Sequence, residues 1–257
     1  MKFLREQCIY GFLLILFCGG CTPVDRCSLI NETQPATKIL FVGNSYIYTN
    51  NLPEVFRQLA CDGNHLVEID SSTSGGWTLA DHVSSSKTLE KLQEKKWGYV
   101  ILQEQSEIPA FEIPRSMQMY PAARTLVAEI RKNGSTPLFL ITWGRKDGLP
   151  EYGIPSFLDM QNRLNAGYLE IARELGVNVI PVGHAWHLVS SQPQPVDLWQ
   201  SDGSHPNSAG TYLAACVIYV RLFQTSPVGL EYIADLPSDA AANLQKFAAD
   251  AVFSGRW

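Results

Sequence analysis

Strand-like apolar segments alternate with helical patterns along most of this sequence, and this alternation is the strongest constraint on its fold. Five short segments have the composition of buried strands. They lie at 38–43, 65–69, 99–102, 138–141 and 177–182. Buried strands that are separated by helices form parallel sheets with a helical layer on each face. We therefore expect an α/β fold with a five-stranded parallel sheet between two layers of helices.

The helical segments are recognised by apolar residues spaced three and four apart. They are expected at 52–62, 79–92, 120–130, 160–175, 209–223 and after 237–239. Asn133-Gly134 and Gly176 are typical helix stops. The 209–223 segment is apolar nearly all round, which predicts a buried helix. Loops are expected at 71–76, 104–115 and 143–154, where glycine, proline and polar residues gather.

The first twenty residues have the order of a bacterial export signal. Lys2 and Arg5 precede an apolar run, residues 9–17, that is too short to span a bilayer. The following Cys18-Gly19-Gly20-Cys21 resembles the lipobox of bacterial lipoproteins, which would make Cys21 the acylated residue. Cys18 stands where a leucine is usual, so an ordinary cleavage site is the alternative. We expect a signal peptide over 1–20, a linker over 21–36 and a folded domain over 37–257.

A lipid on Cys21 would attach the protein to the bacterial cell envelope. The next residue is Thr22 rather than aspartate. By resemblance to bacterial lipoprotein sorting, this favours the outer membrane. The sequence thus predicts a membrane contact through the lipid anchor.

Composition excludes some functions and leaves the cysteine pairing open. The chain of 257 residues carries a net charge of −5, so nothing suggests a nucleic-acid partner. Three cysteines follow Cys21, and they allow at most one bridge: Cys27, Cys61 and Cys216. The last two lie in apolar helical patterns, where buried thiols are the usual interpretation. The histidines at 65, 184 and 187 lack the spacing of metal ligands, so we expect no metal and no cofactor.

Ser45 directly follows the first buried strand, in the sequence Gly43-Asn44-Ser45. Open α/β sheets place their functional sites at the carboxyl ends of their strands. A serine after a glycine can also simply turn the chain or cap a helix. Position alone therefore makes Ser45 a candidate nucleophile without deciding its role.

Asp202 and His205 form the second candidate motif. They are three residues apart, so both side chains would share one face of a helical turn. A carboxylate beside an imidazole fixes its tautomer and leaves the second ring nitrogen free to accept a proton from a hydroxyl. The alternative is a pair of solvated turn residues before the buried helix.

Together these motifs resemble the SGNH (GDSL-like) hydrolases, and the resemblance extends over residues 38–224. It implies a flavodoxin-like α/β/α sandwich and a serine hydrolase triad. By position, Ser45 would be the nucleophile, His205 the general base and acid, and Asp202 the orienting carboxylate. The middle residue is asparagine here instead of the family's aspartate, but it is not the nucleophile.

The family's oxyanion hole implies further residues. It uses the N–H of the nucleophile, a glycine after the second strand and an asparagine after the third. Gly75 and Gly76 are the glycine candidates here, but the third strand is followed by glutamines, Gln103 and Gln105. Gln103 continues the apolar strand and can be paired within the sheet, whereas Gln105 lies in an irregular segment. We expect Gln105 to donate to the oxyanion.

Aromatic and basic residues follow the second and fourth strands. Trp77 and His82 follow the second strand, and Trp143 and Arg145 follow the fourth. At the same sheet edge they could supply an aromatic wall and a cationic contact for a substrate. A tryptophan in the core and a solvated arginine are the alternative interpretations.

The resemblance implies a serine hydrolase that acts on small esters, including acylated carbohydrates, through an acyl-enzyme. An acyltransferase with the same triad is the nearest alternative. A carbohydrate-binding lipoprotein without turnover is a third possibility, because the family's asparagine is missing.

Overall fold

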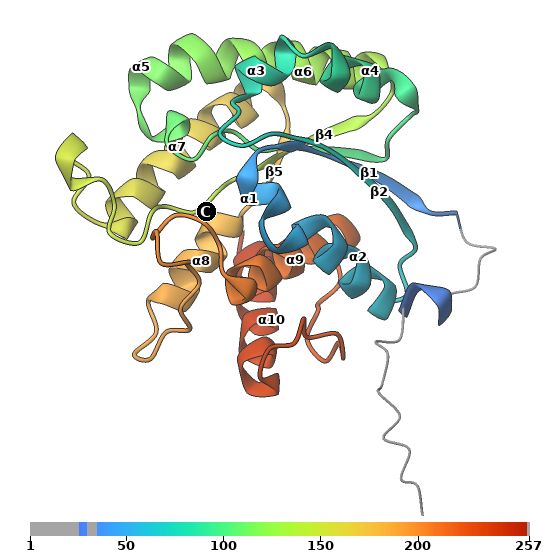
Figure 1. Ribbon diagram of the computed structural model, residues 1–257, viewed down its shortest axis with the longest axis vertical. Coiled ribbons are helices and arrows are strands. Elements are labelled where there is room, and N and C mark those ends of the chain that lie inside the picture. The colour runs from blue at the N-terminus through green and yellow to red at the C-terminus, as the bar shows by residue number, and fades with distance from the viewer. Residues whose placement is uncertain (1–25, 30–34, 256–257) are drawn as a thin grey trace, which may run out of the picture.

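The computed structural model describes residues 26–29 and 35–255, and a sheet of five parallel strands lies at its centre (Figure 1). The strands are β1 (Thr37–Gly43), β2 (Val67–Thr73), β3 (Tyr99–Leu102), β4 (Thr136–Leu140) and β5 (Asn178–Ile180). Their order across the sheet is β2-β1-β3-β4-β5, and all neighbouring pairs are parallel. The expected α/β class and strand number are confirmed. The strand order reverses between β1 and β3, and doubly wound folds bind their ligands at such a reversal.

Helices cover both faces of the sheet (Figure 1). One layer contains α3 (Leu79–Val83), α4 (Ser86–Glu94), α6 (Tyr120–Lys132) and α7 (Phe157–Leu175). The other contains α2 (Leu52–Asp62), α8 (Val182–Ser190), α9 (Ser208–Phe223) and α10 (Ser238–Phe253). Two short helices, α1 (Ser45–Tyr48) and α5 (Glu112–Pro114), lie in connecting segments.

The strands divide their side chains between two apolar cores. In β1, Ile39 and Phe41 pack with the layer of α2 and α9, whereas Leu40 and Val42 pack with the layer of α6 and α7. All four are fully buried, as expected for a central strand whose alternate side chains point to opposite faces. This explains why the sequence shows a continuous apolar run and no polar alternation.

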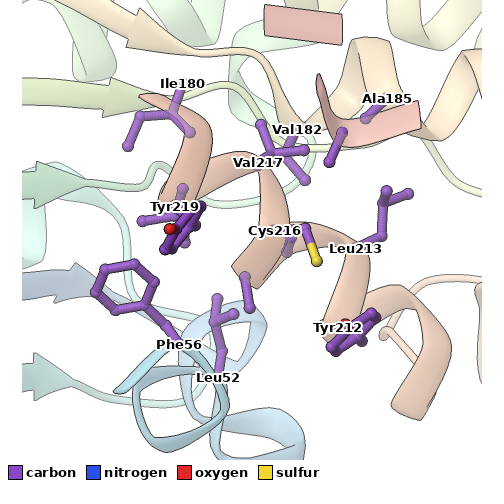
Figure 2. Packing of buried hydrophobic residues seen from close by; sticks show 14 of the residues in the cluster. Leu52, Phe56, Ile180, Val182, Ala185, Tyr212, Leu213, Cys216, Val217 and Tyr219 are labelled. Carbon is purple, nitrogen blue, oxygen red and sulfur yellow. The ribbon is translucent and has the colours of Figure 1, made fainter. Parts of the chain in front are cut away.

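The buried helix α9 lies beneath the sheet and is enclosed by α2, α8 and α10. Figure 2 shows its residues Tyr212, Cys216 and Tyr219 among side chains of α2 and α8. A helix that packs against other elements on nearly every side needs apolar residues all round, which is the pattern that predicted it.

Cys27 and Cys61 form a disulfide bond that joins the 3-10 turn Arg26–Leu29 to α2. The expectation of a buried Cys61 thiol was wrong, because the segment before β1 returns to the carboxyl end of α2. The bridge joins residues 34 apart, and closing such a loop stabilises a fold by about 3–4 kcal/mol in the chain-entropy model. Cys216 is a free and fully buried thiol, and this burial raises its pKa.

Three elements differ from the sequence expectations. β2 begins later and includes polar residues, because an edge strand needs apolar side chains only on its covered positions. The 79–92 segment is two helices, since the Ser85 side chain caps a new helix. The fifth strand is shorter than expected and is followed by α8, whose run of apolar residues resembles a continued strand.

Residues 1–25 lie outside the described residues, so the signal peptide and the acylation of Cys21 stay predictions. Of the helices that the structure describes, none has both the length and the apolar character needed to cross a bilayer.

Candidate active site

The turn after β1 places Ser45 at the carboxyl edge of the sheet. β1 ends at Gly43, Asn44 caps the short helix α1, and Ser45 is the first residue of that helix. A Cβ atom on Gly43 would lie 2.3 Å from Oε1 of Gln103, so only glycine fits where the turn passes the end of β3. The close approach of these two strand ends therefore fixes the position of Ser45.

Ser45, His205 and Asp202 form a continuous chain of hydrogen bonds, although Ser45 and His205 are 160 residues apart in sequence. Nε2 of His205 lies 2.9 Å from Oγ of Ser45, and Nδ1 lies 2.5 Å from Oδ2 of Asp202. An ionised carboxylate can only accept, so Nδ1 carries the ring proton and Nε2 is free to accept from the serine hydroxyl. The structure thus brings the three predicted residues together in the order that nucleophilic catalysis requires.

Asp202 holds His205 through a tight turn. Its Oδ1 accepts from the backbone N–H groups of Ser204 and His205 at 2.9 and 3.0 Å, and Gly203 has φ +66°. Burial alone would raise the pKa of Asp202, but hydrogen bonds from the His205 ring and from these two N–H groups lower it to about 2. The expected helical turn was wrong: the two side chains meet because the carboxylate itself closes the turn.

Aromatic rings pack behind His205. The ring of Tyr46 stacks on Trp143 at a centroid distance of 4.5 Å, and Trp143 stacks on Trp186 at 4.1 Å. Tyr46 also meets the His205 ring edge to face at 5.7 Å. Trp143 is 1% exposed and its indole N–H donates to the carbonyl oxygen of Ser204. The expectation of Trp143 as an aromatic wall for substrate was therefore wrong; it supports the loop that carries His205.

Asn44 joins the nucleophile turn to the two neighbouring strand ends. Its Oδ1 accepts from the Tyr46 N–H, and its Nδ2 donates to the carbonyl oxygen of Trp77 at 2.9 Å. Its backbone N–H donates to Oε1 of Gln103 at 2.8 Å. An aspartate could cap the helix but could not donate to Trp77. The hydrogen bond to Trp77 therefore explains why this chain has asparagine rather than aspartate at position 44.

Gln103 and Gln105 have different surroundings. Gln103 is fully buried, its amide oxygen accepts from Asn44, and its Nε2 donates to the Glu104 carbonyl oxygen at 2.5 Å. The amide oxygen of Gln105 accepts from the backbone N–H groups of Glu107 and Ile108. Among the residues that the structure describes, none accepts a hydrogen bond from the Gln105 side-chain nitrogen. Gln103 is therefore part of the scaffold, while Gln105 keeps a donor available.

The loop after β2 carries the two candidate glycines. Gly76 has φ +72°, a left-handed conformation that favours glycine. A Cβ atom on Gly75 would lie 3.1 Å from the hydroxyl oxygen of Tyr48, in the short helix that begins at Ser45. Gly76 therefore adopts the left-handed conformation that the turn requires, and Gly75 is the glycine that lies close to α1.

Trp77 and His82 differ in exposure. His82 is fully buried; its Nε2 donates to the Gly43 carbonyl oxygen at 2.9 Å, and its Nδ1 accepts from Thr88. Burial lowers the pKa of His82, which keeps the ring neutral in this position. The Trp77 ring meets His82 edge to face and is only partly buried. Trp77 can still reach a ligand, whereas His82 supports the end of β1.

Arg145 is already paired. Its guanidinium donates to Oε1 of Glu107 at 2.5 Å, and the arginine side chain is 35% exposed. This ion pair places the Arg145 guanidinium beside the loop that contains Gln105. No group of three metal-ligating side chains occurs among the described residues.

Comparisons with known proteins give a structural answer only. No protein-family model and no curated protein sequence matches the chain. A solved candidate SGNH hydrolase from Slackia heliotrinireducens is 26% identical, with a TM-score of 0.62 over 72% of this chain and 98% of that one. A DUF4886 family protein from Bacteroides uniformis gives a TM-score of 0.73 at 18% identity, over 85% and 95%.

An acetylxylan esterase from Geobacillus stearothermophilus, solved as a catalytic mutant, gives a TM-score of 0.54 at 14% identity, over 76% of this chain and 95% of that one. The chain has the fold of the SGNH hydrolases. Its structural neighbours include esterases of this fold.

The sequence did not predict the residues that support the candidate site. Tyr46 and Asn44 flank Ser45, but an aromatic and an amide in that position carry no distinctive spacing. Glu104 stands among glutamines in the sequence, although it is fully buried in the structure. A charged residue so close to the end of a buried strand is the only signal that could have indicated its role.

Proposed function

We propose that the protein is a serine ester hydrolase that works through an acyl-enzyme. The observation that carries the proposal is the hydrogen bond of 2.9 Å between Ser45 Oγ and His205 Nε2, with Asp202 on the opposite ring nitrogen. This arrangement can remove the serine proton while the oxygen attacks a carbonyl carbon.

In the first half-reaction, Ser45 Oγ bonds to the ester carbonyl carbon and its proton passes to His205 Nε2. The carbonyl oxygen becomes an oxyanion. When the tetrahedral intermediate collapses, the bond to the alcohol oxygen breaks and that oxygen takes the proton from His205. Asp202, with its pKa near 2, stays ionised at any ordinary working pH and stabilises the imidazolium.

In the second half-reaction, water replaces the alcohol. His205 accepts a proton from the water, whose oxygen attacks the acyl carbon on Ser45. The second intermediate collapses by breaking the bond to Ser45 Oγ, which regains the proton from His205. The products are a carboxylic acid and free enzyme.

Three donors would stabilise the oxyanion: the N–H of Ser45, the N–H of Gly75 and the side-chain amide of Gln105. Gly75 is favoured over Gly76 because it approaches the nucleophile helix. Gln105 is favoured over Gln103, whose amide oxygen and nitrogen are both engaged within the scaffold. Removal of one such donor typically lowers kcat by ~10²–10³.

The substrate class we propose is an acetylated carbohydrate or a similar small ester. Support comes from the acetylxylan esterase among the structural neighbours and from Trp77, whose partly exposed ring lies by the glycine loop. Arg145, paired with Glu107, would contribute polar contacts to the alcohol side. We further propose that a lipid on Cys21 holds the enzyme in the bacterial envelope, at the outer membrane.

The decisive experiment combines turnover with labelling of the serine. Wild-type protein should hydrolyse p-nitrophenyl acetate and react with a fluorophosphonate probe, and Ser45→Ala should lose both. Ser116→Ala, on an exposed serine far from the strand ends in sequence, is the matched control and should keep both. A Ser45→Ala protein that retains a tenth of wild-type turnover would exclude Ser45 as the nucleophile.

The substrate and the acceptor need separate measurements. Acetylated xylo-oligosaccharides should release acetate in a Ser45-dependent reaction. Appearance of acetyl groups on an added sugar, in place of free acetate, would favour an acyltransferase instead. Sugar binding without either product would favour the binding protein.

A further inference from the structure

Glu104 is a charged side chain in a buried position near the candidate site. It lies two residues after the end of β3 and is fully buried. Its Oε1 accepts two backbone hydrogen bonds, from the N–H of Gln105 at 2.7 Å and from the N–H of Leu79 at 3.1 Å. Gln105 belongs to the loop after β3, and Leu79 begins α3 after the loop of β2. One oxygen atom therefore joins the two loops that flank the nucleophile turn.

The surroundings of Glu104 make its burial costly. The charge of Asp81 has the same sign and raises the pKa of Glu104 further, and the phenol of Tyr168 also interacts with the carboxylate. No described residue forms a hydrogen bond with Oε2. Burial raises the pKa of Glu104 to about 7, while the two N–H bonds lower it. An apolar residue of similar size would fill the space without this cost but could not accept the two bonds.

The backbone of Glu104 is fixed on both sides. Its N–H donates to the hydroxyl oxygen of Tyr168 in α7 at 3.0 Å, and its carbonyl oxygen accepts from Gln103. The carboxylate is thus held to the sheet and to α7 while it reaches the two loops. A fixed acceptor of this kind sets a distance between them, which a mobile surface side chain could not do.

We propose that Glu104 is a positioning residue that sets the spacing between the glycine loop at 74–78 and Gln105, the two sources of oxyanion donors outside the nucleophile turn. The inference rests on the proposed function, because it assigns these loops to the oxyanion hole. Glu104 contacts neither substrate nor reacting atoms and acts only through the two N–H groups.

The position of donors matters most in the transition state, where the charge on the oxyanion is greatest. Loss of the shared acceptor should therefore lower kcat by ~10²-fold, with little change in KM. Glu104→Leu removes the acceptor and keeps similar bulk. Glu104→Gln keeps an acceptor oxygen for both N–H groups and should retain kcat within about threefold, the usual context variation of a single contact. Glu90→Gln, on an exposed residue of α4, is the control.

The test compares Glu104→Leu and Glu104→Gln by kinetics, thermal unfolding and amide hydrogen exchange. Glu104→Leu should exchange faster than wild type in both the 74–79 and 104–108 segments, and Glu104→Gln should not. The loss of kcat in Glu104→Leu should not add to the loss in Gln105→Ala, because both changes act on the same set of oxyanion donors. Faster exchange in only one segment, additive losses, or equal slowing in both Glu104 variants would overturn the inference.

Failure of the proposed function has a different signature. If wild-type protein shows no Ser45-dependent turnover, the hydrolase proposal fails. Exchange in the two loops would still decide whether Glu104 joins them. If Glu104→Leu is too unstable to measure, Glu104→Gln carries the test: slow turnover with wild-type stability would contradict an acceptor role.

Discussion

Ser45 is supported in different ways on its two sides. On the side of His205 the support is aromatic, with Tyr46, Trp143 and Trp186 in successive stacks. On the side of β2 and β3 it is a set of hydrogen bonds through Asn44 and Glu104. The first side holds His205, the proposed general base, and the second holds the proposed oxyanion donors.

The two kinds of support tolerate different substitutions. Packed rings respond to volume, so a smaller side chain leaves a cavity and lowers stability. Hydrogen bonds respond to the identity of donor and acceptor, so an isosteric change can lower rate while the fold persists. In the proposed mechanism His205 transfers protons between oxygen atoms, whereas the oxyanion donors must stay fixed around a developing negative charge. The two supports suit these two tasks.

The largest effect is expected where the two sides meet, at His205. His205→Ala should lower kcat by up to ~10⁶, because Ser45 then has no base. The double variant with Ser45→Ala should be no slower than either single variant, since both remove the same unit. Steady-state kinetics with a chromogenic acetyl ester make the comparison. Losses that multiply in the double variant would mean that the two residues act independently.

On the aromatic side, Trp143→Ala should lower the free energy of unfolding by about 3–5 kcal/mol, the usual cost of emptying a buried tryptophan site. The change removes the stacks on Tyr46 and Trp186 and the hydrogen bond to Ser204. Denaturant unfolding measures it. Trp143→Phe keeps a ring and should lose less; a loss below about 1 kcal/mol in the alanine variant would contradict a supporting role.

On the polar side, the two glutamines should separate rate from stability. Gln105→Ala should lower kcat by ~10²–10³ and leave KM and the free energy of unfolding nearly unchanged. Gln103→Ala should lower stability by about 1–3 kcal/mol, because the buried Asn44 N–H loses its acceptor. Kinetics and unfolding of both variants decide. If Gln105→Ala turns over normally, only backbone N–H groups form the oxyanion hole.

The sequence predicted the sheet and the grouping of Ser45 with His205 because each has a local signature. Buried strands show as apolar runs, and Ser45 and His205 stand beside such runs or beside a buried helix. Long-range partners have no such signature. The bridge from Cys27 to Cys61 depends on where the chain returns, and the burial of Trp143 depends on Tyr46 and Trp186.

The choice between Gln103 and Gln105 shows the same limit at shorter range. The sequence favoured Gln105 on its place after the strand, but only the structure shows that Gln103 accepts from Asn44 and donates to Glu104. Asp202 and His205 show that a correct pairing can rest on a wrong local geometry. Their spacing suited a helix, and a turn closed by the carboxylate satisfies it equally well.

Glu104 should make the stability of the fold depend on pH. Its pKa is about 7 in the fold, against an ordinary value of 4.5, so the folded state binds more protons between these values. Stability should therefore fall as pH rises from about 4.5 to 7, by about 3 kcal/mol for this group. Glu104→Gln removes this contribution. Denaturant unfolding at pH 5 and pH 8 should show wild type losing more stability than the variant; parallel changes would contradict the raised pKa.

The smallest effect is expected at the hydroxyl of Tyr46, where a polar contact lies within the aromatic side. Its oxygen lies 2.8 Å from Oγ of Ser204, and burial raises the pKa of the phenol, which stays neutral. Tyr46→Phe keeps the stack on Trp143 and the edge-to-face contact with His205, and it should lower the free energy of unfolding by about 1 kcal/mol with kcat nearly unchanged. The double variant with Ser204→Ala should cost less than the sum of the single losses, because it removes both partners of this contact. If Tyr46→Phe instead lowers kcat as strongly as Gln105→Ala without lowering stability, this side also works through directed hydrogen bonds, and the contrast between the two supports of Ser45 disappears.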